Sequence, residues 1–306
     1  MGSKFNNDDK TKVLSLIKKG KISLVLVSER LREDRDVVLA AVGVNGDELR
    51  YACLELQNDK EVVMKAAGNK GNSLVYASKE MRDDEEVVRK AVENNPGAFV
   101  YASKRLRNIK NLVLLVVGKN GNLLGYASKK LRADKEVAMK AVSNYGGALK
   151  YTSEKLCDDY GVVLKAVKNS GWVLQYASER LRDNLDIVMA AVRQDPVALK
   201  WASDRMKKNK KIVMMAVKKH DKAIEDADYE LIKDKDVLNA YLSSCYKKGF
   251  DFKGGVINAL ENEYDNLLQE EKLILQRQNK IRLLLMHLDP SYVRRAEEKG
   301  KVKVKK

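Results

Sequence analysis

The chain has 306 residues, of which 44% are hydrophobic, and a formal net charge of +16 at pH 7. It is long enough for two ordinary domains, and its hydrophobic share is ample for a buried core. Only three residues are proline, while Lys, Ala, Val, Leu and Glu are abundant. This composition argues against a sandwich or barrel, in which turn residues recur at strand spacing, so we expect an all-α protein.

The cysteines and the N-terminus give expectations about the compartment. Cys53, Cys157 and Cys245 are odd in number and widely spaced, so we expect small buried side chains in a reducing compartment, without a disulfide or a zinc site. The first residues lack the apolar segment of a signal peptide, and no window approaches the roughly 18 apolar residues of a transmembrane helix. The sequence predicts an intracellular protein, cytoplasmic or within a larger particle, that does not insert into membranes.

Residues 1–19 are expected to form an N-terminal segment or cap, and residues 20–245 carry a 25-residue repeat. We define its anchor position as the residue two places after a recurrent aromatic residue. A constant period of this length indicates a solenoid, in which each copy packs on its neighbours. The anchors follow one another without insertion and are Ser28, Cys53, Ser78, Ser103, Ser128, Ser153, Ser178, Ser203 and Asp228.

A helix is expected to begin six residues after each anchor. That cap position holds Asp or Asn, which are favoured at helix N-caps, in every copy except the one with Ile109. The apolar stripe that follows, as in Val87, Val88, Ala91 and Val92, predicts a helix of about ten residues. Eighteen residues after the anchor, a turn is predicted by Gly46, Gly71, Pro96, Gly121, Gly146, Gly171 and Pro196.

A second apolar pattern predicts a second helix in each copy, as in Phe99, Tyr101, Ala102 and Leu106. Helices of about ten residues are marginal in isolation, so each pair needs neighbours on both sides to bury its apolar stripes. The sequence therefore predicts an all-α solenoid of nine 25-residue two-helix repeats, followed by a long C-terminal helix.

The repeat motif V-V-x-K-A-V-x-N-x-G-x-x-L-x-Y-A-S-x-x-L-R-x-D resembles the tandem repeat called domain of unknown function 4116, over about residues 20–245. The Tyr-Ala-Ser triplet stands intact at 76–78, 101–103, 126–128 and 176–178. The layout is also similar to the leucine-rich variant repeat, an α-solenoid of similar period. The resemblance implies a helical repeat fold and brings no activity, cofactor or site residue with it.

Three further segments follow the repeats. Glycines in residues 246–255 predict a linker, and apolar residues near a four-three spacing in residues 256–288 predict one long helix. We expect that helix to fold back as a cap on the last repeat. The alternative is a helix for dimerisation or for docking into a larger complex. Residues 289–306 form a basic tail that we expect to be disordered.

The basic excess lies in the middle and later repeats. Residues 1–100 hold 17 basic and 17 acidic side chains, whereas residues 101–225 hold 26 and 12. Cations recur two and four positions after the anchors of repeats four to eight. Because equivalent positions stack in a solenoid, we expect them to form one basic ridge that binds a partner. This ridge consists of Arg105, Arg107, Lys130, Arg132, Lys155, Arg180, Arg182, Arg205 and Lys207.

Two interpretations of the basic ridge stay open. Such a stripe attracts phosphate backbones or acidic protein surfaces, with binding that weakens as salt rises. Alternatively, it is a solvated helix face whose arginines partly pair with neighbouring carboxylates. A ladder of aromatic residues could also offer stacking platforms for bases, but its place on an apolar stripe favours packing between repeats. The ladder is Tyr51, Tyr76, Tyr101, Tyr126, Tyr151, Tyr176 and Trp201.

No catalytic or cofactor site can be assembled from the sequence. His220 and His287 are the only histidines, no phosphate-binding loop is present, and Asp residues that cap helices are poor general bases. We expect no enzyme activity, metal or cofactor. The predicted function is non-catalytic macromolecular binding or scaffolding, most readily with a protein partner. The alternatives are sequence-independent binding of nucleic acid and a structural role in a larger particle such as a virion.

Overall fold

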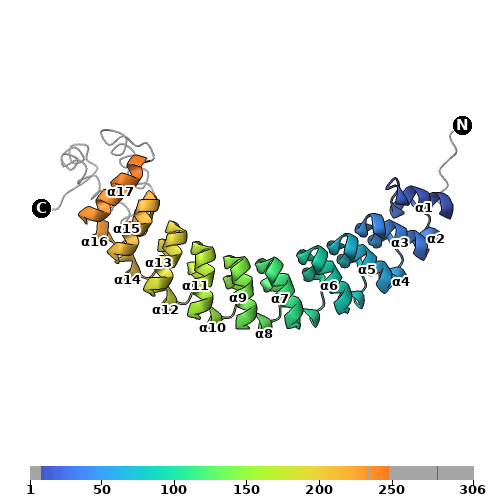
Figure 1. Ribbon diagram of the computed structural model, residues 1–306, viewed down its shortest axis with the longest axis horizontal. Helices are drawn as coiled ribbons and strands as arrows, with labels where there is room; N and C mark the ends of the chain where they lie inside the picture. Colours follow the sequence, from blue (N-terminus) through green and yellow to red (C-terminus); the bar gives the residue numbers. More distant parts are fainter. Residues whose placement is uncertain (1–7, 233, 248–280, 282–306) are drawn as a thin grey trace, which may run out of the picture. The chain divides into compact units, whose positions relative to one another are not determined.

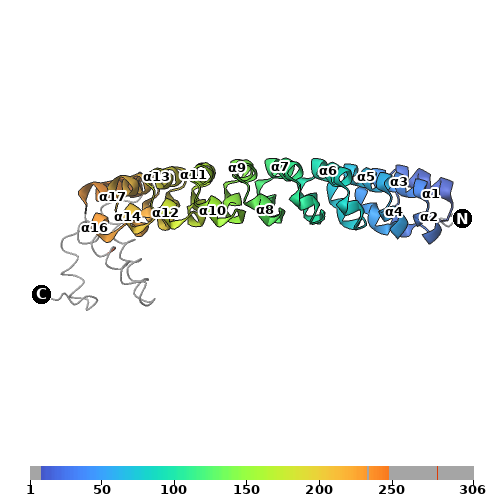
Figure 2. The ribbon, with the colours of Figure 1, turned by 90° about the horizontal axis from the view of Figure 1, so that it is seen from below.

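The computed structural model describes residues 8–232, 234–247 and 281, and it divides the chain into two compact units, Met1–Leu156 and Cys157–Lys306. The described residues form helices joined by short turns, with no strand among them, so the expected all-α repeat fold is confirmed. Within each unit, long helices lie side by side in one row and short helices in a second row (Figures 1 and 2).

The first unit contains six copies of a three-part element. Its long helices are α1 (Lys10–Lys18), α3 (Arg35–Val44), α5 (Lys60–Asn69), α6 (Glu85–Asn94), α7 (Lys110–Lys119) and α9 (Lys135–Asn144). The 3-10 helices that follow them are η1 (Leu24–Leu26), η2 (Gly46–Tyr51), η3 (Gly71–Tyr76), η5 (Pro96–Tyr101), η7 (Gly121–Tyr126) and η8 (Gly146–Tyr151). Single helical turns complete the copies: α2 (Glu29–Arg32), α4 (Leu54–Gln57), η4 (Met81–Asp83), η6 (Leu106–Asn108), α8 (Lys129–Arg132) and α10 (Glu154–Cys157).

The second unit continues the same order. Its long helices are α11 (Tyr160–Asn169), α13 (Leu185–Gln194), α15 (Lys210–Lys219) and α17 (Lys235–Lys247). The elements between them are η9 (Gly171–Tyr176), α12 (Glu179–Arg182), η10 (Pro196–Trp201), α14 (Asp204–Lys207), η11 (Asp221–Asp226) and α16 (Tyr229–Ile232).

The ends of the chain add two observations to the expected segments. Helix α1 begins at Lys10 and α3 at Arg35, exactly one repeat later, so the repeat register already begins within residues 1–19. Helix α17 continues to Lys247, into the segment expected to be a linker. The rest of that segment, the expected helix 256–288 and the tail 289–306 lie outside the described residues, except for Ile281, which is helical and buried.

The expected helix caps are confirmed. Their side-chain oxygens accept hydrogen bonds from backbone amides in the first turn of the following helix, whereas Ile109 gives α7 no side-chain cap. Each capped helix then buries the apolar stripe, for example Val87, Val88, Ala91 and Val92 of α6, all fully buried. The capping residues are Asp34, Asp59, Asp84, Asp134, Asp159, Asn184, Asn209 and Asp234.

The second helix of each repeat is divided in two. It begins as a six-residue 3-10 helix, such as Pro96–Tyr101, becomes extended at Ala102, and resumes as a single turn at Leu106–Asn108. At the anchor, the Ser103 hydroxyl accepts a hydrogen bond from the amide of Leu106 and so caps the new turn. Cys53 makes no such side-chain cap, although the helix is divided there too. The anchor's own amide is directed out of the repeat.

That anchor amide forms a backbone hydrogen bond to the preceding repeat. The amide of Ser103 donates to the carbonyl of Arg82 over 3.0 Å, and the amide of Ser203 donates to that of Arg182 over 3.0 Å. The same bond, always to the equivalent carbonyl of the preceding repeat, occurs for the anchors Cys53, Ser78, Ser128, Ser153, Ser178 and Asp228. It links consecutive repeats through groups that every sequence supplies, which explains why the anchor can vary between Ser, Cys and Asp.

We call the contact between two consecutive repeats a joint. In several joints, a side chain at the end of a long helix also bonds the turn of the preceding repeat. Asn94 of α6 accepts the amide of Gly71 over 2.8 Å and donates to the carbonyl of Gly68 over 3.0 Å. Asn69 and Asn144 do the same for Gly46 and Gly121. The joint is tight, because a Cβ atom on Gly71 would lie 2.3 Å from the carbonyl oxygen of Ala91.

Where the turn residue is proline and not glycine, the residue that bonds the turn also differs. Pro96 has no amide proton that needs an acceptor, and the next repeat carries Lys119 in place of the bridging Asn. The Lys119 ammonium donates to the carbonyl of Glu93 over 2.7 Å, and Lys219 bonds Arg193 in the same way after Pro196. Helices α6 and α7 also pack less closely than α5 and α6.

Gly71→Ala should therefore weaken the contact between the turn at Gly71 and helix α6. We expect it to lower the free energy of unfolding by about 1–3 kcal/mol, because the added methyl group must displace backbone of the next helix. Gly161→Ala in α11 is the matched control, since its Cβ would find ordinary contact at 3.4 Å and should leave stability unchanged or raise it by up to about 1 kcal/mol. Urea unfolding followed by circular dichroism measures both. Equal effects of the two substitutions would contradict the tight joint.

Candidate functional site: the basic ridge

Three arginines of the basic ridge are held in ion pairs with the preceding repeat. Arg105 Nε lies 3.1 Å from both carboxylate oxygens of Asp83, and its Nη2 donates to the Asp83 carbonyl. The Ser103 hydroxyl donates to the same carboxylate. These hydrogen bonds, first from Ser103 and then from Arg105, lower the pKa of Asp83. Arg180 and Arg205 form the same arrangement with Asp158 and Asp183.

This pairing follows a rule that can be read in the sequence. Arg occurs two residues after an anchor wherever the partner position at the end of the preceding repeat holds Asp, and Arg30 with Asp8 is the fourth example. Where the partner position does not hold Asp, the later residue is not Arg. Those five pairs are Glu33 with Glu55, Asn58 with Glu80, Asn108 with Lys130, Ala133 with Lys155, and Lys208 with Glu230. The ridge prediction missed this signal, because it compared equivalent positions of the repeats and not different positions in adjoining repeats.

The arginines four residues after the anchors are half-buried and take part in packing. Arg107 Nε donates to the carbonyl of Ala102 over 2.8 Å. The Nε atoms of Arg132 and Arg182 are buried without a hydrogen-bond partner among the described residues, and Arg182 Nη2 lies 4.0 Å from Glu179. The carbonyls of these arginines accept the anchor amides of the next repeat. The backbone of these arginines thus takes part in the contact with the next repeat, while their half-buried side chains contribute less open charge than the ridge prediction assumed.

Three lysines of the predicted ridge, Lys130, Lys155 and Lys207, form no ion pair among the described residues. Lys130 and Lys155 are exposed on α8 and α10 of the first unit, beside exposed Lys129 and, one repeat earlier, exposed Lys104. We name Lys104, Lys129, Lys130 and Lys155 the lysine cluster. Residues 101–150 hold eleven Lys and Arg but two Asp and Glu, so this part of the ridge keeps its charge.

A second set of ion pairs lies at the first residue of the long helices. Lys60 contacts Asp84 at 3.0 Å and Glu86 at 2.7 Å in the next repeat, and these carboxylates raise the pKa of Lys60. The same pairs are made by Lys10, Arg35, Lys110 and Lys210. They are missing before Ile109, Asn184 and Asn209, whose joints carry the Asp–Arg pairs of Arg105, Arg180 and Arg205 instead. Many charged side chains of the repeats thus form ion pairs that connect one repeat to the next.

The aromatic ladder is only partly covered. None of its seven side chains is fully buried, and Tyr126 is 47% exposed. The residue before the ring covers it where that residue is basic: Arg50 lies 4.4 Å above Tyr51 and Lys150 lies 4.6 Å above Tyr151. The ladder therefore presents ring surface to solvent. Contact with the preceding repeat, as expected, is made by Tyr151, whose hydroxyl donates to Asn122 over 3.2 Å.

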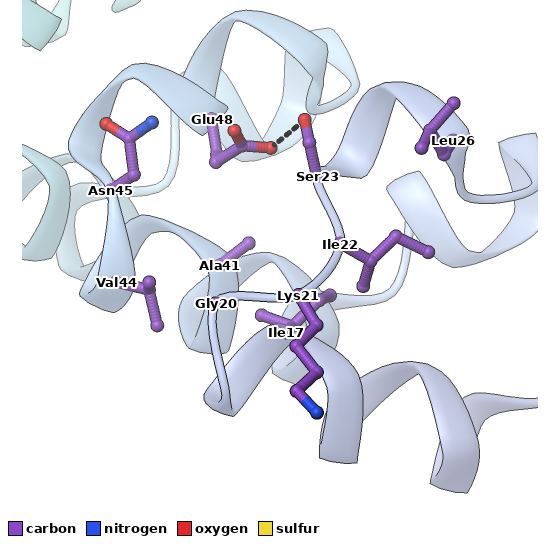
Figure 3. Close-up of a pocket in the computed structure, with 10 residues that line it drawn as sticks. All are labelled: Ile17, Gly20, Lys21, Ile22, Ser23, Leu26, Ala41, Val44, Asn45 and Glu48. Carbon is purple, nitrogen blue, oxygen red and sulfur yellow. Dashed lines mark hydrogen bonds between the residues drawn. The ribbon is translucent and has the colours of Figure 1, made fainter.

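A pocket of about 250 Å³ lies where α1 meets α3, at the first joint of the first unit (Figure 3). Its polar wall is Glu48, whose Oε2 accepts the Ser23 hydroxyl over 2.7 Å and the Leu24 amide over 2.6 Å. Its apolar wall includes Ile17 and Val44. Glu48 takes up the polar groups of the short helix η1, so it completes this joint and offers no acid–base pair.

The remaining candidate groups are scattered. The described residues contain no cluster of His, Cys, Asp and Glu that could hold a metal ion. Cys53, Cys157 and Cys245 form no disulfide with one another, and Cys245 is buried as expected, whereas Cys53 and Cys157 are half-buried. His220 Nδ1 lies 4.0 Å from Asp221, and His287 is outside the described residues. No helix in the described part of the chain is long and apolar enough to cross a membrane.

The carboxylates of the joints predict a pH dependence. The Arg35 pair, at 2.9 Å, holds the pKa of Asp59 below its ordinary value. A lowered folded-state pKa gives stability that is fully present above the unfolded pKa of about 4 and is lost as pH falls through the folded value. Asp59→Asn keeps an N-cap, as Asn184 and Asn209 show, and removes the charge.

We expect Asp59→Asn to lower the urea midpoint at pH 7 and to match the unsubstituted protein near pH 2. Urea unfolding curves recorded between pH 7 and pH 2 measure the difference. Asp186→Asn, at an exposed carboxylate without an ion pair in the described residues, is the control and should show a smaller change. A midpoint difference for Asp59→Asn that stays constant down to pH 2 would contradict a stabilising role of the pair.

Comparison with known proteins supports the repeat architecture. No curated protein and no solved structure matches the chain. The family model described as domain of unknown function (DUF4116) matches five times, at residues 9–57, 59–107, 109–157, 159–207 and 191–233. Each of the first four matches covers two 25-residue repeats, and the first begins at α1, in agreement with the repeat register. The chain belongs to the DUF4116 family as a tandem repeat protein.

Proposed function

We propose that this protein is a non-catalytic binding scaffold that engages a macromolecular partner through exposed cations of the basic ridge. The observation that carries the proposal is that two cations of the ridge have no role in the pairing between the described repeats. At Lys130 and Lys155 the cation is present while the position of its carboxylate holds Asn108 and Ala133. Joint formation accounts for Arg105, Arg180 and Arg205, but it gives no reason for these two exposed lysines.

The uses of the acidic residues support a function without catalysis. The pKa values of Asp59 and Asp134 are lowered by hydrogen bonds from cations of the neighbouring repeat, and then by hydrogen bonds from backbone amides of the helices that these residues cap. Hydrogen bonds from the Ser178 hydroxyl and then from Arg180 lower the pKa of Asp158. A general base near neutral pH needs a raised carboxyl pKa or a histidine in a sheltered site. The carboxylates Asp59, Asp134 and Asp158 are shifted in the opposite direction.

The ion pairs determine which cations of the ridge can be substituted without loss of stability. Reversing Arg105, Arg180 or Arg205 would break a joint, so lost binding could reflect lost stability. Lys130→Glu combined with Lys155→Glu leaves the joints intact. Lys65→Glu combined with Lys90→Glu, at exposed residues of α5 and α6, is the matched control with the same change of net charge.

We expect a tagged pull-down from native lysate, quantified by mass spectrometry, to lose its main partner at least tenfold with the Lys130/Lys155 variant and to keep it with the control. Thermal unfolding of both variants confirms that the fold is retained. Capture that is the same for both variants and the unsubstituted protein contradicts a binding role of these lysines.

A further inference from the structure

We propose that the lysine cluster and Tyr126 together bind a single-stranded nucleic acid. The inference deepens the proposed scaffold function by naming the class of partner, and it rests on that function. Two independent features of the first unit point to this ligand: cations without carboxylates, which suit a phosphate backbone, and an open aromatic ring, which suits an unpaired base.

The charge of the cluster is not neutralised locally. Lys104, Lys129, Lys130 and Lys155 are exposed and form no ion pair among the described residues. Glu154 is the one acidic residue in the segments 103–108, 128–133 and 153–156. The short helices of the first unit lie in one row (Figure 2). Lys129 and Lys130 belong to α8 and Lys155 to α10 of that row, so equivalent positions stack from repeat to repeat. A line of cations follows a phosphate backbone without reading its sequence.

The ring of Tyr126 is open because of the residue before it. In the repeats with Tyr51, Tyr151 and Trp201, the preceding Arg or Lys lies over the ring within 4.4–5.3 Å. Before Tyr126 stands Gly125, which has no side chain to do so, and Tyr126 is the most exposed ring of the ladder at 47%. Space for a larger residue is absent, since a Cβ on Gly125 would lie 3.0 Å from the Tyr151 ring.

The two features lie close together. Tyr126 ends η7 and Lys129 begins α8, only three residues later. Three residues of chain span at most about 11 Å, so a base stacked on Tyr126 keeps its phosphates within reach of Lys129 and Lys130. A duplex would hide its base faces inside the stack, whereas a single strand offers them to the ring. The lysines alone would suit an acidic protein as well as a phosphate backbone, whereas lysines beside an open ring suit a strand that offers both phosphates and unpaired bases.

The test is fluorescence anisotropy of a labelled 20-nucleotide oligo(dT) with the full-length chain, over a range of salt concentrations. Replacing Lys129, Lys130 and Lys155 together by Gln should weaken binding at least tenfold and reduce the slope of log affinity against log salt by about 2, from about 0.7 per lost phosphate contact. Tyr126→Ala should weaken it by about tenfold through lost stacking.

Matched controls separate the site from net charge and from fold. Lys65, Lys90 and Lys140 are exposed on the long helices, and their replacement by Gln removes the same charge. Tyr160→Ala removes a tyrosine of similar exposure, 42%, from α11. Both controls should bind within about twofold of the unsubstituted protein. Equal losses with the control lysines, or no loss with Tyr126→Ala, overturn the proposed site.

Failure of this inference is distinguishable from failure of the scaffold function. If oligo(dT) does not bind while Lys130→Glu with Lys155→Glu still abolishes capture of a protein partner, the nucleic-acid inference is wrong and the scaffold function stands. If the lysine substitutions change neither oligo(dT) binding nor partner capture, both are wrong.

Discussion

The hydrogen bond from each anchor amide to a backbone carbonyl of the preceding repeat is the constraint on which the remaining structure depends. It fixes the separation of consecutive short helices, and the amide can reach its acceptor only if the chain leaves the helix at the anchor. The second helix of each repeat must therefore stop after six residues and restart as a single turn. A 3-10 helix suits this purpose, because its rise of about 2 Å per residue spans the repeat with few residues. The side chains then adapt to a backbone that is the same in every copy.

Side-chain chemistry at the joints varies between repeats in correlated pairs. Gly71 with Asn94 and Pro96 with Lys119 are two solutions to one problem, since the turn either donates an amide proton or lacks one. Asp83 with Arg105 and Lys60 with Asp84 are two ways of connecting neighbouring repeats by charge. The first two repeats use both, through Arg30 with Asp8 and Lys10 with Asp34. Each exposed pair contributes little alone, so their role is to match each repeat to its neighbour more than to add large increments of stability. Pairing between repeats therefore accounts for many of the charged side chains, and no binding partner is needed to explain them.

Features that depend on periodicity within one repeat could be predicted from the sequence. Contacts between a residue and the neighbouring repeat could not. Caps such as Asp84 and the buried stripe of α6 follow from local pattern, because the helix they begin is defined by the same ten residues. The break at Ala102 was missed, since the apolar spacing of Phe99 and Leu106 is continuous across it. The role of Arg105 depends on Asp83, in the preceding repeat, and comparison of equivalent positions hides such a partner. The structure shows that Asp83 pairs with Arg105. Only then is it evident that Lys130, with Asn108 at the equivalent position, has no such partner.

Amide hydrogen exchange at the anchors, followed by NMR or by mass spectrometry with short peptides, tests most directly whether the anchor amides bond to the preceding repeat. Ser78, Ser103 and Ser128 stand at the start of short helical turns, where first-turn amides ordinarily lack acceptors and exchange quickly. Bonded to the preceding repeat, their amides should be protected about as strongly as those of Val88 and Val113 in the long helices. Protection at that level supports joints made of backbone. Exchange as fast as in an exposed turn would contradict them, and with them the division of the cations into joint residues and a free lysine cluster.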